Sequence, residues 1–304
     1  MPRMSSKNND NTALFAPIFI LIWSTGFIIA RYGMPYSEPM TFLFLRFAAV
    51  VACMLPVVIW LKAPWPSWRQ AGHIAIAGAL FQFGYLGGVW EAIKLGMPAG
   101  LSSLIVGLQP ILTAVLASLV AEHVTRRQWF GLLLGIAGVA MVLFEKISVD
   151  GLTPASIGFI VTGLFSITLG TLYQKRFCPA FDLRTGSVVQ FATSAVLCLI
   201  LALAFETREI QWTAPMIGAL AWGVGPISIG AMTLWFILLR DGRATRVSSM
   251  MYLTPPTTAI MAWILFGERL TAMILGGTLV TMIGVLVVNQ ALMPGWLQRA
   301  VRGN

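Results

Sequence analysis

Two prolines stand near the middle of long apolar segments, where they change what the backbone can bind. Pro110 and Pro256 each lack an N–H group and free the carbonyl four residues earlier, at Val106 and Tyr252. Inside a membrane, such carbonyls persist only where protein, water or a ligand covers them. The two prolines therefore predict broken helices that line a cavity. The alternative is a kink that only shapes packing, because proline is common in membrane helices.

Polar and aromatic side chains accompany these two positions and could hydrogen-bond a solute. Trp23 lies in the middle of its apolar segment, where its indole N–H needs a partner. For the serines, the alternative role is a hydrogen bond to their own helix or to a neighbouring one. The predicted binding residues are Trp23, Arg46, Gln82, Tyr85, Ser102, Gln109, Pro110, Ser248, Tyr252 and Pro256.

Arg46 lies about 9 Å below the end of its apolar segment, if that segment is helical. A charge at that depth must face protein or water and be paired. We expect it either to bind a carboxylate-bearing solute or a gate partner, or to reach the headgroups or pair with Glu38 or Glu91. Every acidic residue lies at or beyond a segment end, so a permanent cation would find no counter-charge at mid-depth. This favours a neutral or zwitterionic solute with an apolar part.

Three charged residues lie where the proline-containing segments end. Glu122 ends the first of these segments, and Glu268 and Arg269 end the second. We predict that Glu122, Glu268 and Arg269 act as helix caps or as gate salt bridges, rather than as proton carriers.

The composition places all these residues in a membrane. Of the 304 residues, 58% are hydrophobic and only 10% are charged, against about 25% charged in a soluble domain. This excludes an ordinary soluble domain, and the high hydrophobicity excludes disorder. The net charge of +9 comes from basic residues scattered between apolar segments, which indicates contact with lipid rather than with nucleic acid.

Signatures of enzymes and of metal sites are missing from the sequence. It has no HExxH, no GxSxG, and no phosphate-binding or calcium-binding loop. The three cysteines do not have the spacing of metal ligands. We therefore expect no cofactor, no metal and no enzymatic activity.

The apolar segments number ten, and each can cross about 30 Å of hydrocarbon as a helix. With both termini inside, the inner segments hold 14 Lys and Arg and the outer segments hold 4, as the positive-inside rule requires. The predicted fold is an all-α membrane protein with ten transmembrane helices and cytoplasmic termini. The predicted helices are residues 14–33, 40–62, 71–93, 97–120, 128–145, 156–176, 186–206, 213–239, 245–266 and 270–292.

The second half of the chain repeats the first half at a constant offset of 146 residues. Identical pairs include Ser102 and Ser248, Pro110 and Pro256, Glu122 and Glu268, Gly131 and Gly277, and Gly138 and Gly284. Because each half has an odd number of spans, the two halves must be inserted in opposite orientations, as in secondary transporters. The predicted domains are a cytoplasmic tail (1–13), a five-helix repeat (14–145), an inverted five-helix repeat (156–292) and a second tail (293–304).

With these features the sequence resembles the ten-helix drug/metabolite transporter superfamily of the EamA type. The resemblance lies in residues 23–27 (Trp-Ser-Thr-Gly-Phe), 45–47 (Leu-Arg-Phe), 109–122 and 256–270, and it covers about residues 14–290. One departure is His123, where the second half has Arg269. The resemblance implies a transporter, since members mostly export amino acids, metabolites or toxic compounds and some import.

The predicted function is secondary transport by alternating access in the plasma (inner) membrane. Export of amino acids or related neutral or zwitterionic compounds is favoured. The alternatives are a multidrug or toxic-compound exporter or a metabolite importer of the same fold, and, more remotely, a membrane protein that does not transport. The predicted partners are a small-molecule substrate, the lipid bilayer and a coupling ion such as a proton, with no nucleic acid. The chain is expected to be a monomer or a homodimer.

Overall fold

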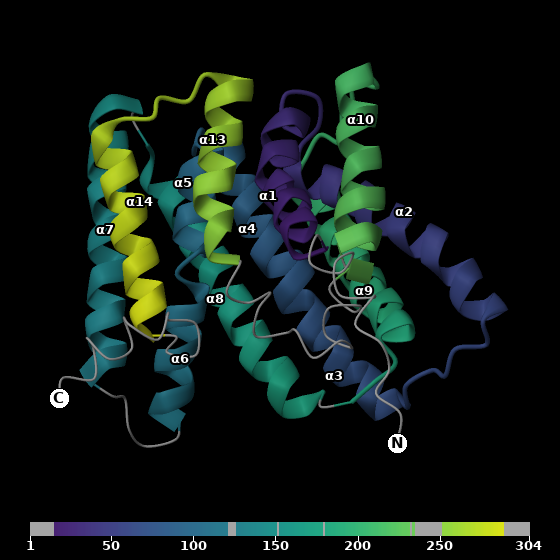
Figure 1. The fold of residues 1–304 in the computed structure, drawn as a ribbon. Coiled ribbons are helices and arrows are strands. Elements are labelled where there is room, and N and C mark those ends of the chain that lie inside the picture. The colour runs from purple at the N-terminus through teal and green to yellow at the C-terminus, as the bar shows by residue number, and fades with distance from the viewer. Residues whose placement is uncertain are drawn as a thin grey trace, which may run out of the picture.

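The computed structural model describes residues 15–120, 126–150, 152–178, 180–231, 233–234 and 251–288, and these residues are almost entirely helical (Figure 1). Short helical pieces that interrupt or extend the α-helices are labelled η. The elements are α1 (Phe15–Gly33), α2 (Pro39–Trp60), α3 (Trp68–Gly78), η3 (Ala79–Gly84), α4 (Tyr85–Lys94), α5 (Ala99–Val106), α6 (Gln109–Val120), α7 (Arg126–Asp150), α8 (Pro154–Phe177), α9 (Leu183–Phe205), α10 (Ala214–Trp222), η4 (Gly223–Gly230), η5 (Met251–Leu253), α13 (Thr254–Phe266) and α14 (Ala272–Val288).

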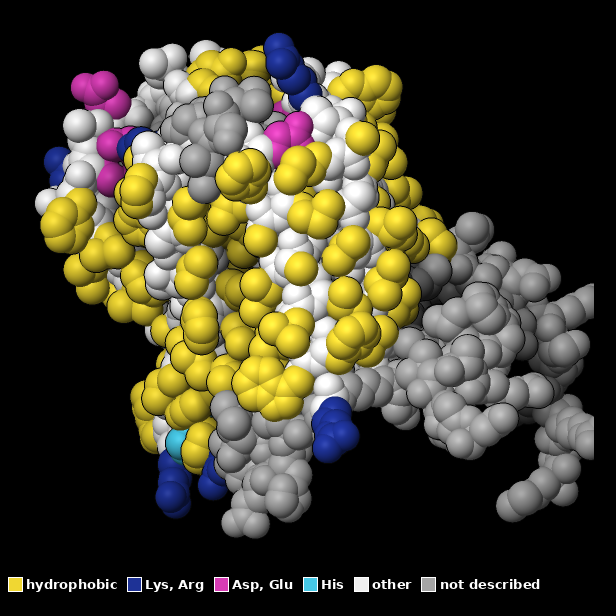
Figure 2. All heavy atoms as spheres, turned by 90° about the vertical axis from the view of Figure 1, so that its left-hand side faces the viewer, with side chains coloured by type: hydrophobic (Ala, Val, Ile, Leu, Met, Phe, Trp, Pro, Cys, Tyr) yellow, Lys and Arg dark blue, Asp and Glu magenta, His cyan; other side chains and the backbone are white. Residues whose placement is uncertain are grey.

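Within the described residues, 6 helices are long and apolar enough to cross a membrane. Shorter apolar helices cover Pro17–Gly33, Ala214–Gly230 and Ala272–Val288. Figure 2 shows one face of the molecule, on which hydrophobic side chains form a broad band and the charged side chains lie toward the two ends. Exposed apolar side chains such as Phe144, Leu133 and Ile264 belong to such a surface, since lipid rather than water is their solvent. The membrane protein expected from the composition is confirmed at this level.

Local sequence signals explain where several helices begin and end. The side chains of Ser67, Thr153 and Thr213 each accept a backbone N–H from the first turn of the helix that follows, which is the usual N-cap arrangement. At the other end of a helix, Gly267 caps α13 with a positive φ of 66°, a conformation that glycine adopts without a steric penalty.

Two π-helices interrupt transmembrane segments at equivalent places in the two halves. The predicted helix 71–93 consists of α3, η3 and α4, and η4 follows α10 in the second half. The π-helices end at Gly84 and Gly230, which are 146 residues apart, the same offset as the sequence repeat. Short π-helical stretches occur mostly as bulges inside α-helices, frequently at functional sites.

The segment with Pro110 is interrupted just before the proline, and the described part of the segment with Pro256 changes from a 3₁₀-helix to an α-helix there. Gly107 and Leu108 separate α5 from α6, and Pro110 is the second residue of α6. In the second half, Pro256 lies in the first turn of α13, directly after the short 3₁₀-helix η5. Proline is tolerated in a first turn because its missing N–H would have no partner there. The two breaks are in contact, since a Cβ added at Gly107 would lie 3.1 Å from Pro255 Cγ.

The helices α7 and α14 pack side by side along two reciprocal glycine contacts (Figure 1). A Cβ added at Gly131 would lie 2.7 Å from Gly284 O, and one at Gly284 would lie 2.7 Å from Gly131 O. Seven residues further along α7, Gly138 faces Gly277 in the same reciprocal way. The residue number rises along one helix as it falls along the other, so these two equivalent helices run antiparallel.

Contacts between helix ends define one side of the molecule, drawn at the top of Figure 1 and called the upper side below. Glu268 follows α13 and contacts the start of α5 and the end of α1. The end of α1 and the start of α14 therefore both lie on the upper side. The start of α1 and the end of α14 lie on the opposite side. The described part of the chain starts and finishes on the same side.

Candidate functional site

Arg46 is the most deeply buried charge in the described part of the chain. It lies on α2, and the residue is only 3% exposed. Its Nε atom lies 3.2 Å from both Gly223 O and Ser228 Oγ, and its Nη2 atom lies 3.0 Å from Ser228 Oγ. Its Nη1 atom is buried and has no hydrogen-bond partner in the part of the chain that the structure describes.

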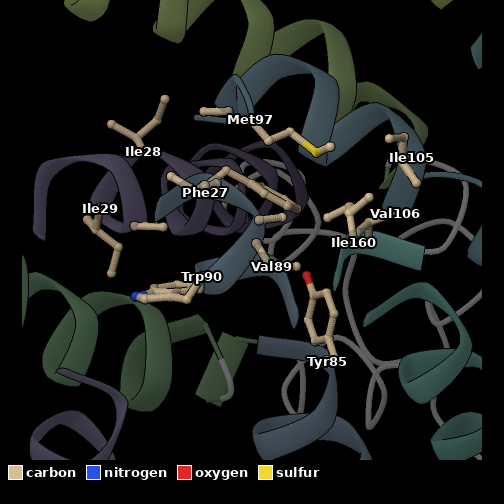
Figure 3. Packing of buried hydrophobic residues seen from close by; sticks show 14 of the residues in the cluster. Phe27, Ile28, Ile29, Tyr85, Val89, Trp90, Met97, Ile105, Val106 and Ile160 are labelled. Atoms are coloured by element: carbon tan, nitrogen blue, oxygen red, sulfur yellow. The ribbon is translucent and has the colours of Figure 1, made fainter. Parts of the chain in front are cut away.

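Two aromatic rings flank the guanidinium of Arg46. Its Cζ atom lies 5.7 Å from the ring centre of Trp90 and 5.9 Å from that of Phe47, within the range of cation–π attraction. Trp90 is 1% exposed, and the described residues provide no hydrogen-bond partner for its indole Nε1 either. Figure 3 shows this nitrogen pointing away from the hydroxyl of Tyr85. We call Arg46, Phe47, Trp90, Gly223 and Ser228 the Arg46–Trp90 cluster.

The π-helix η4 positions the side chain of Arg46. Ser228 Oγ lies 2.8 Å from Gly223 O, so the hydroxyl and the carbonyl that bind the guanidinium also bind each other. Gly223 lacks a Cβ, and one added there would lie 3.3 Å from Arg46 Cδ and 3.1 Å from Ile29 Cδ1. A side chain at this position would therefore require Arg46 or Ile29 to shift by a few tenths of an ångström.

A second group of buried polar atoms lies between α1 and the start of α13. Ser24 is fully buried, and Thr254 is 6% exposed. Within the described segments, neither hydroxyl has a hydrogen-bond partner. Thr258, one turn further along α13, has its Oγ1 3.4 Å from Ser24 O. These hydroxyls lie beside the helix break that contains Pro256.

Trp23 and Gln109, two further predicted residues of the first half, have different neighbours. Trp23 is half-buried, and its ring centre lies 5.6 Å from that of Phe19. The amide Nε2 of Gln109 donates to Thr113 Oγ1 at 3.3 Å and to Thr171 Oγ1 at 3.1 Å. The bond to Thr171 joins α6 to α8, directly after the break between α5 and α6.

Gln82 lies in η3 and Tyr85 is the first residue of α4, but their surroundings differ. Gln82 is half-buried within η3. Tyr85 is 6% exposed and belongs to the main hydrophobic core. In Figure 3 its hydroxyl points toward the region of Val106 and Ile160, where α5 and α8 meet.

Ser102 bonds to its own helix. It is fully buried, and its hydroxyl donates to Pro98 O at 3.0 Å, which is the alternative role that we considered for the serines. Pro110 and Pro256 are half-buried. Tyr252 lies in η5, and its side chain is not described. Ser248 and Glu122 lie outside the described residues.

Glu268 links three helices on the upper side. Its Oε1 accepts the backbone N–H of Ala99 at 3.0 Å and its Oε2 that of Gly100 at 3.4 Å. Oε1 also lies 3.6 Å from Arg31 Nη1. Glu268 therefore caps α5 and joins it to α1, while its neighbour Arg269 is exposed.

Two further glutamates tie the upper ends of α2 and α9 together. Glu206 accepts the N–H groups of Met40 and Thr41 and the Thr41 hydroxyl, each at 2.7 Å. Glu38 lies 3.1 Å from Lys94 Nζ and accepts the N–H groups of Thr207 and Arg208. Partial burial raises the pKa of Glu38, but these hydrogen bonds outweigh it and hold the pKa below the ordinary value of 4.5.

No three His, Cys, Asp or Glu side chains of the described segments come together in a way that could hold a metal ion. Of the five members of the Arg46–Trp90 cluster, only Arg46 was among the predicted binding residues; Phe47, Trp90, Gly223 and Ser228 were not. Trp90 is four residues from the end of its helix, which is typical of an interface anchor, and Ser228 is an ordinary hydroxyl in an apolar segment. The available signal was the stretch Gly223–Gly230, where three glycines and a proline occur within eight residues.

Comparisons with known proteins agree with this architecture. The sequence matches the EamA-like transporter family twice, over residues 11–144 and 154–290. It is 31% identical over 302 residues to the uncharacterized transporter YvbV of Bacillus subtilis (strain 168), covering 94% of both chains. It is 29% identical over 288 residues to a probable amino-acid metabolite efflux pump of Salmonella typhimurium (strain LT2), covering 90% of this chain and 92% of that one. A solved structure entitled "Crystal structure of protein" has a TM-score of 0.64 and 19% identity, and the match covers 93% of this chain and 98% of that one.

Proposed function

Because this chain belongs to the EamA-like transporter family, we propose that it is a secondary transporter that exports amino acids or related neutral or zwitterionic metabolites by alternating access. It is a multi-pass protein of the plasma (inner) membrane. The proposed partners are a small-molecule substrate, the bilayer and a coupling ion such as a proton.

The observation that carries this proposal is the contact between the two helix breaks. Gly107 in the first half lies against Pro255 in the second half, in the interior of an apolar bundle. Broken helices in secondary transporters present free backbone groups to a substrate near the midplane, where the two repeats meet. The orphan hydroxyls of Ser24 and Thr254 lie beside this point. They give it further polar atoms without a protein partner.

The reciprocal contacts of α7 and α14 support the proposed inverted repeat. Two equivalent helices that run antiparallel and exchange the same glycine contacts are related by a two-fold axis perpendicular to them. In a membrane that axis lies in the plane of the bilayer, which is the inverted topology. The proposed arrangement is ten transmembrane helices, with repeats 14–145 and 156–292 and with the tails 1–13 and 293–304 in the cytoplasm.

The placement of acidic residues supports a substrate without a permanent positive charge. Every acidic residue in the described part of the chain lies in a loop, or at or within three residues of the end of an apolar span, Glu91 being the deepest inside one. A cation at mid-depth would lose its hydration without meeting a carboxylate, which is costly in a medium of low dielectric. The relative named as an amino-acid metabolite efflux pump agrees with this substrate class.

Counterflow in proteoliposomes tests the proposal, because exchange needs no ion gradient. Vesicles that hold one unlabelled amino acid from a panel should accumulate the same labelled amino acid. Pro256→Ala should slow this exchange, whereas Pro154→Ala, in the first turn of α8, should leave it unchanged. Robust exchange of tetraphenylphosphonium with no exchange of any amino acid would contradict the proposed substrate class.

Cysteine labelling tests the proposed cavity independently of transport. In a background without the three native cysteines, single cysteines at positions 23, 109 and 252 should react with a small water-soluble thiol reagent. Protection at all three positions, with normal labelling at an outer-loop control, would mean that these faces are packed and dry.

A further inference from the structure

Arg46 is a buried charge for which the described residues supply no counter-charge. Its 3% exposure excludes an extended side chain that reaches the headgroups. The two acids that the sequence suggested as partners do not pair with it, since Glu38 binds Lys94 and Thr207 and Glu91 makes no ion pair in the described structure. Uncompensated burial of a cation is strongly unfavourable. A carbonyl, a hydroxyl and two aromatic rings compensate the charge only in part.

Two donors in the cluster also lack acceptors. Arg46 Nη1 and Trp90 Nε1 are both buried, and neither has a hydrogen-bond partner among the described residues. A guanidinium and an indole can donate hydrogen bonds but cannot accept them. Only a hydrogen-bond acceptor can pair with these two donors. Because Arg46 is positively charged, an anionic acceptor is favoured.

We propose that Arg46 and Trp90 form a subsite that binds the carboxylate group of the transported solute. This inference rests on the proposed function and names the group by which the solute is recognised. One carboxylate oxygen accepts from Arg46 Nη1 and the other from Trp90 Nε1. A single guanidinium matches the single charge of a carboxylate better than the double charge of a phosphate. The rings of Trp90 and Phe47 beside it suit a solute with an apolar body.

Ser228 and Gly223 are positioning residues in this subsite. They hold Nε and Nη2 of Arg46 from η4, which leaves Nη1 as the free donor. Since η4 belongs to the second half of the chain and Arg46 to the first, the subsite requires both repeats. Its two free donors come from α2 and α4, and η4 holds the guanidinium from the other repeat.

Matched pairs of small probes test the subsite on the purified full-length protein in detergent. The probes are acetate, isovalerate and benzoate, each compared with its neutral amide, at constant ionic strength. Only a ligand that favours the folded state raises the apparent unfolding temperature, and its concentration dependence reports affinity. We expect at least one acid to bind about tenfold or more tightly than its amide.

Four variants assign the preference to the proposed donors. Arg46→Gln should abolish the acid-over-amide preference, and Arg46→Lys should keep part of it. Trp90→Phe keeps the ring but removes the donor, so it should weaken acid binding about fivefold and leave amide binding unchanged. Ser228→Ala should reduce the preference less than Arg46→Gln does. The exposed residues Arg69 and Trp68 provide matched controls, because Arg69→Gln and Trp68→Phe should have no effect.

The outcomes separate this inference from the proposed function. Equal effects of acids and amides on the unmodified protein, including no effect of either, would overturn the subsite, as would an acid preference that survives in Arg46→Gln. If Arg46→Gln does not fold, Trp90→Phe and Arg46→Lys decide the matter. Amino-acid counterflow with no acid-over-amide preference would support the proposed transport function and contradict the carboxylate subsite. An acid-over-amide preference without counterflow would support the subsite and contradict the proposed transport function.

Discussion

Substitution of one glycine in the α7–α14 contact tests both the packing and the inverted repeat. A Cβ at Gly277 would lie 2.6 Å from both Gly138 O and Val142 Cγ2, roughly 1 Å closer than the optimal separation of nonbonded atoms. The neighbouring Gly276 is a matched control on the same helix, because a Cβ there would have only Met141 Cε nearby, at 3.9 Å.

The expected magnitude follows from two opposing effects. Alanine in a helix is more favourable than glycine by about 0.5–1 kcal/mol, and Gly276→Ala should show this gain. At Gly277, overpacking costs about 1–3 kcal/mol and should outweigh the gain. Both variants have the alanine gain, so they should differ by the overpacking cost of about 1–3 kcal/mol, which corresponds to roughly 2–10 °C in apparent unfolding temperature.

Tryptophan fluorescence during heating of the purified protein measures this difference, and a double-mutant cycle then tests the direction of the helices. Gly138→Ala and Gly277→Ala share one contact, so their effects should be non-additive by about 1 kcal/mol. Gly131→Ala and Gly277→Ala should add within about 0.5 kcal/mol, because these positions are far apart in antiparallel packing. Coupling between 131 and 277, with none between 138 and 277, would refute the antiparallel register and remove the main support for the inverted repeat.

Three further predictions concern the upper side and the topology. Glu206→Ala removes the cap of α2 and should lower stability by about 2 kcal/mol, while the exposed Glu209→Ala should be neutral in the same thermal assay. Because the pKa of Glu38 is lower in the folded protein, its stabilisation is present above about pH 4.5 and is lost as the pH falls through the folded value. In the Glu38→Gln variant, the apparent unfolding temperature should therefore fall less steeply as the pH is lowered below about 4.5. An unchanged dependence on pH would show that Glu38 does not stabilise the fold in this way. Reporter fusions after residues 66, 150, 210 and 304 should give cytoplasmic signals at 66 and 304 only, and a periplasmic C-terminus would contradict the ten-helix arrangement.

The amino-acid sequence was sufficient to locate the apolar helices of the described residues and the interruption before Pro110. Segment hydropathy depends on a run of neighbouring residues, and proline acts on the carbonyl one turn earlier. Both effects are local, so Pro110 could be assigned to an interruption without knowing what packs against it. The offset of 146 residues is also visible in the sequence, and it extends to the ends of η3 and η4.

Only the tertiary structure decides which side chains meet. Arg46 and Ser228 are 182 residues apart and come together because α2 crosses η4, whereas the sequence offered Glu38 or Glu91 as partners. Glu268 pairs with Arg31 rather than with its neighbour Arg269, since the end of α13 lies beside the end of α1. Trp90 is near a helix end by count, yet it is buried, because burial depends on the rotation of a helix and on its neighbours. These contacts depend on how distant helices cross and pack, and no local pattern of residue types encodes that geometry.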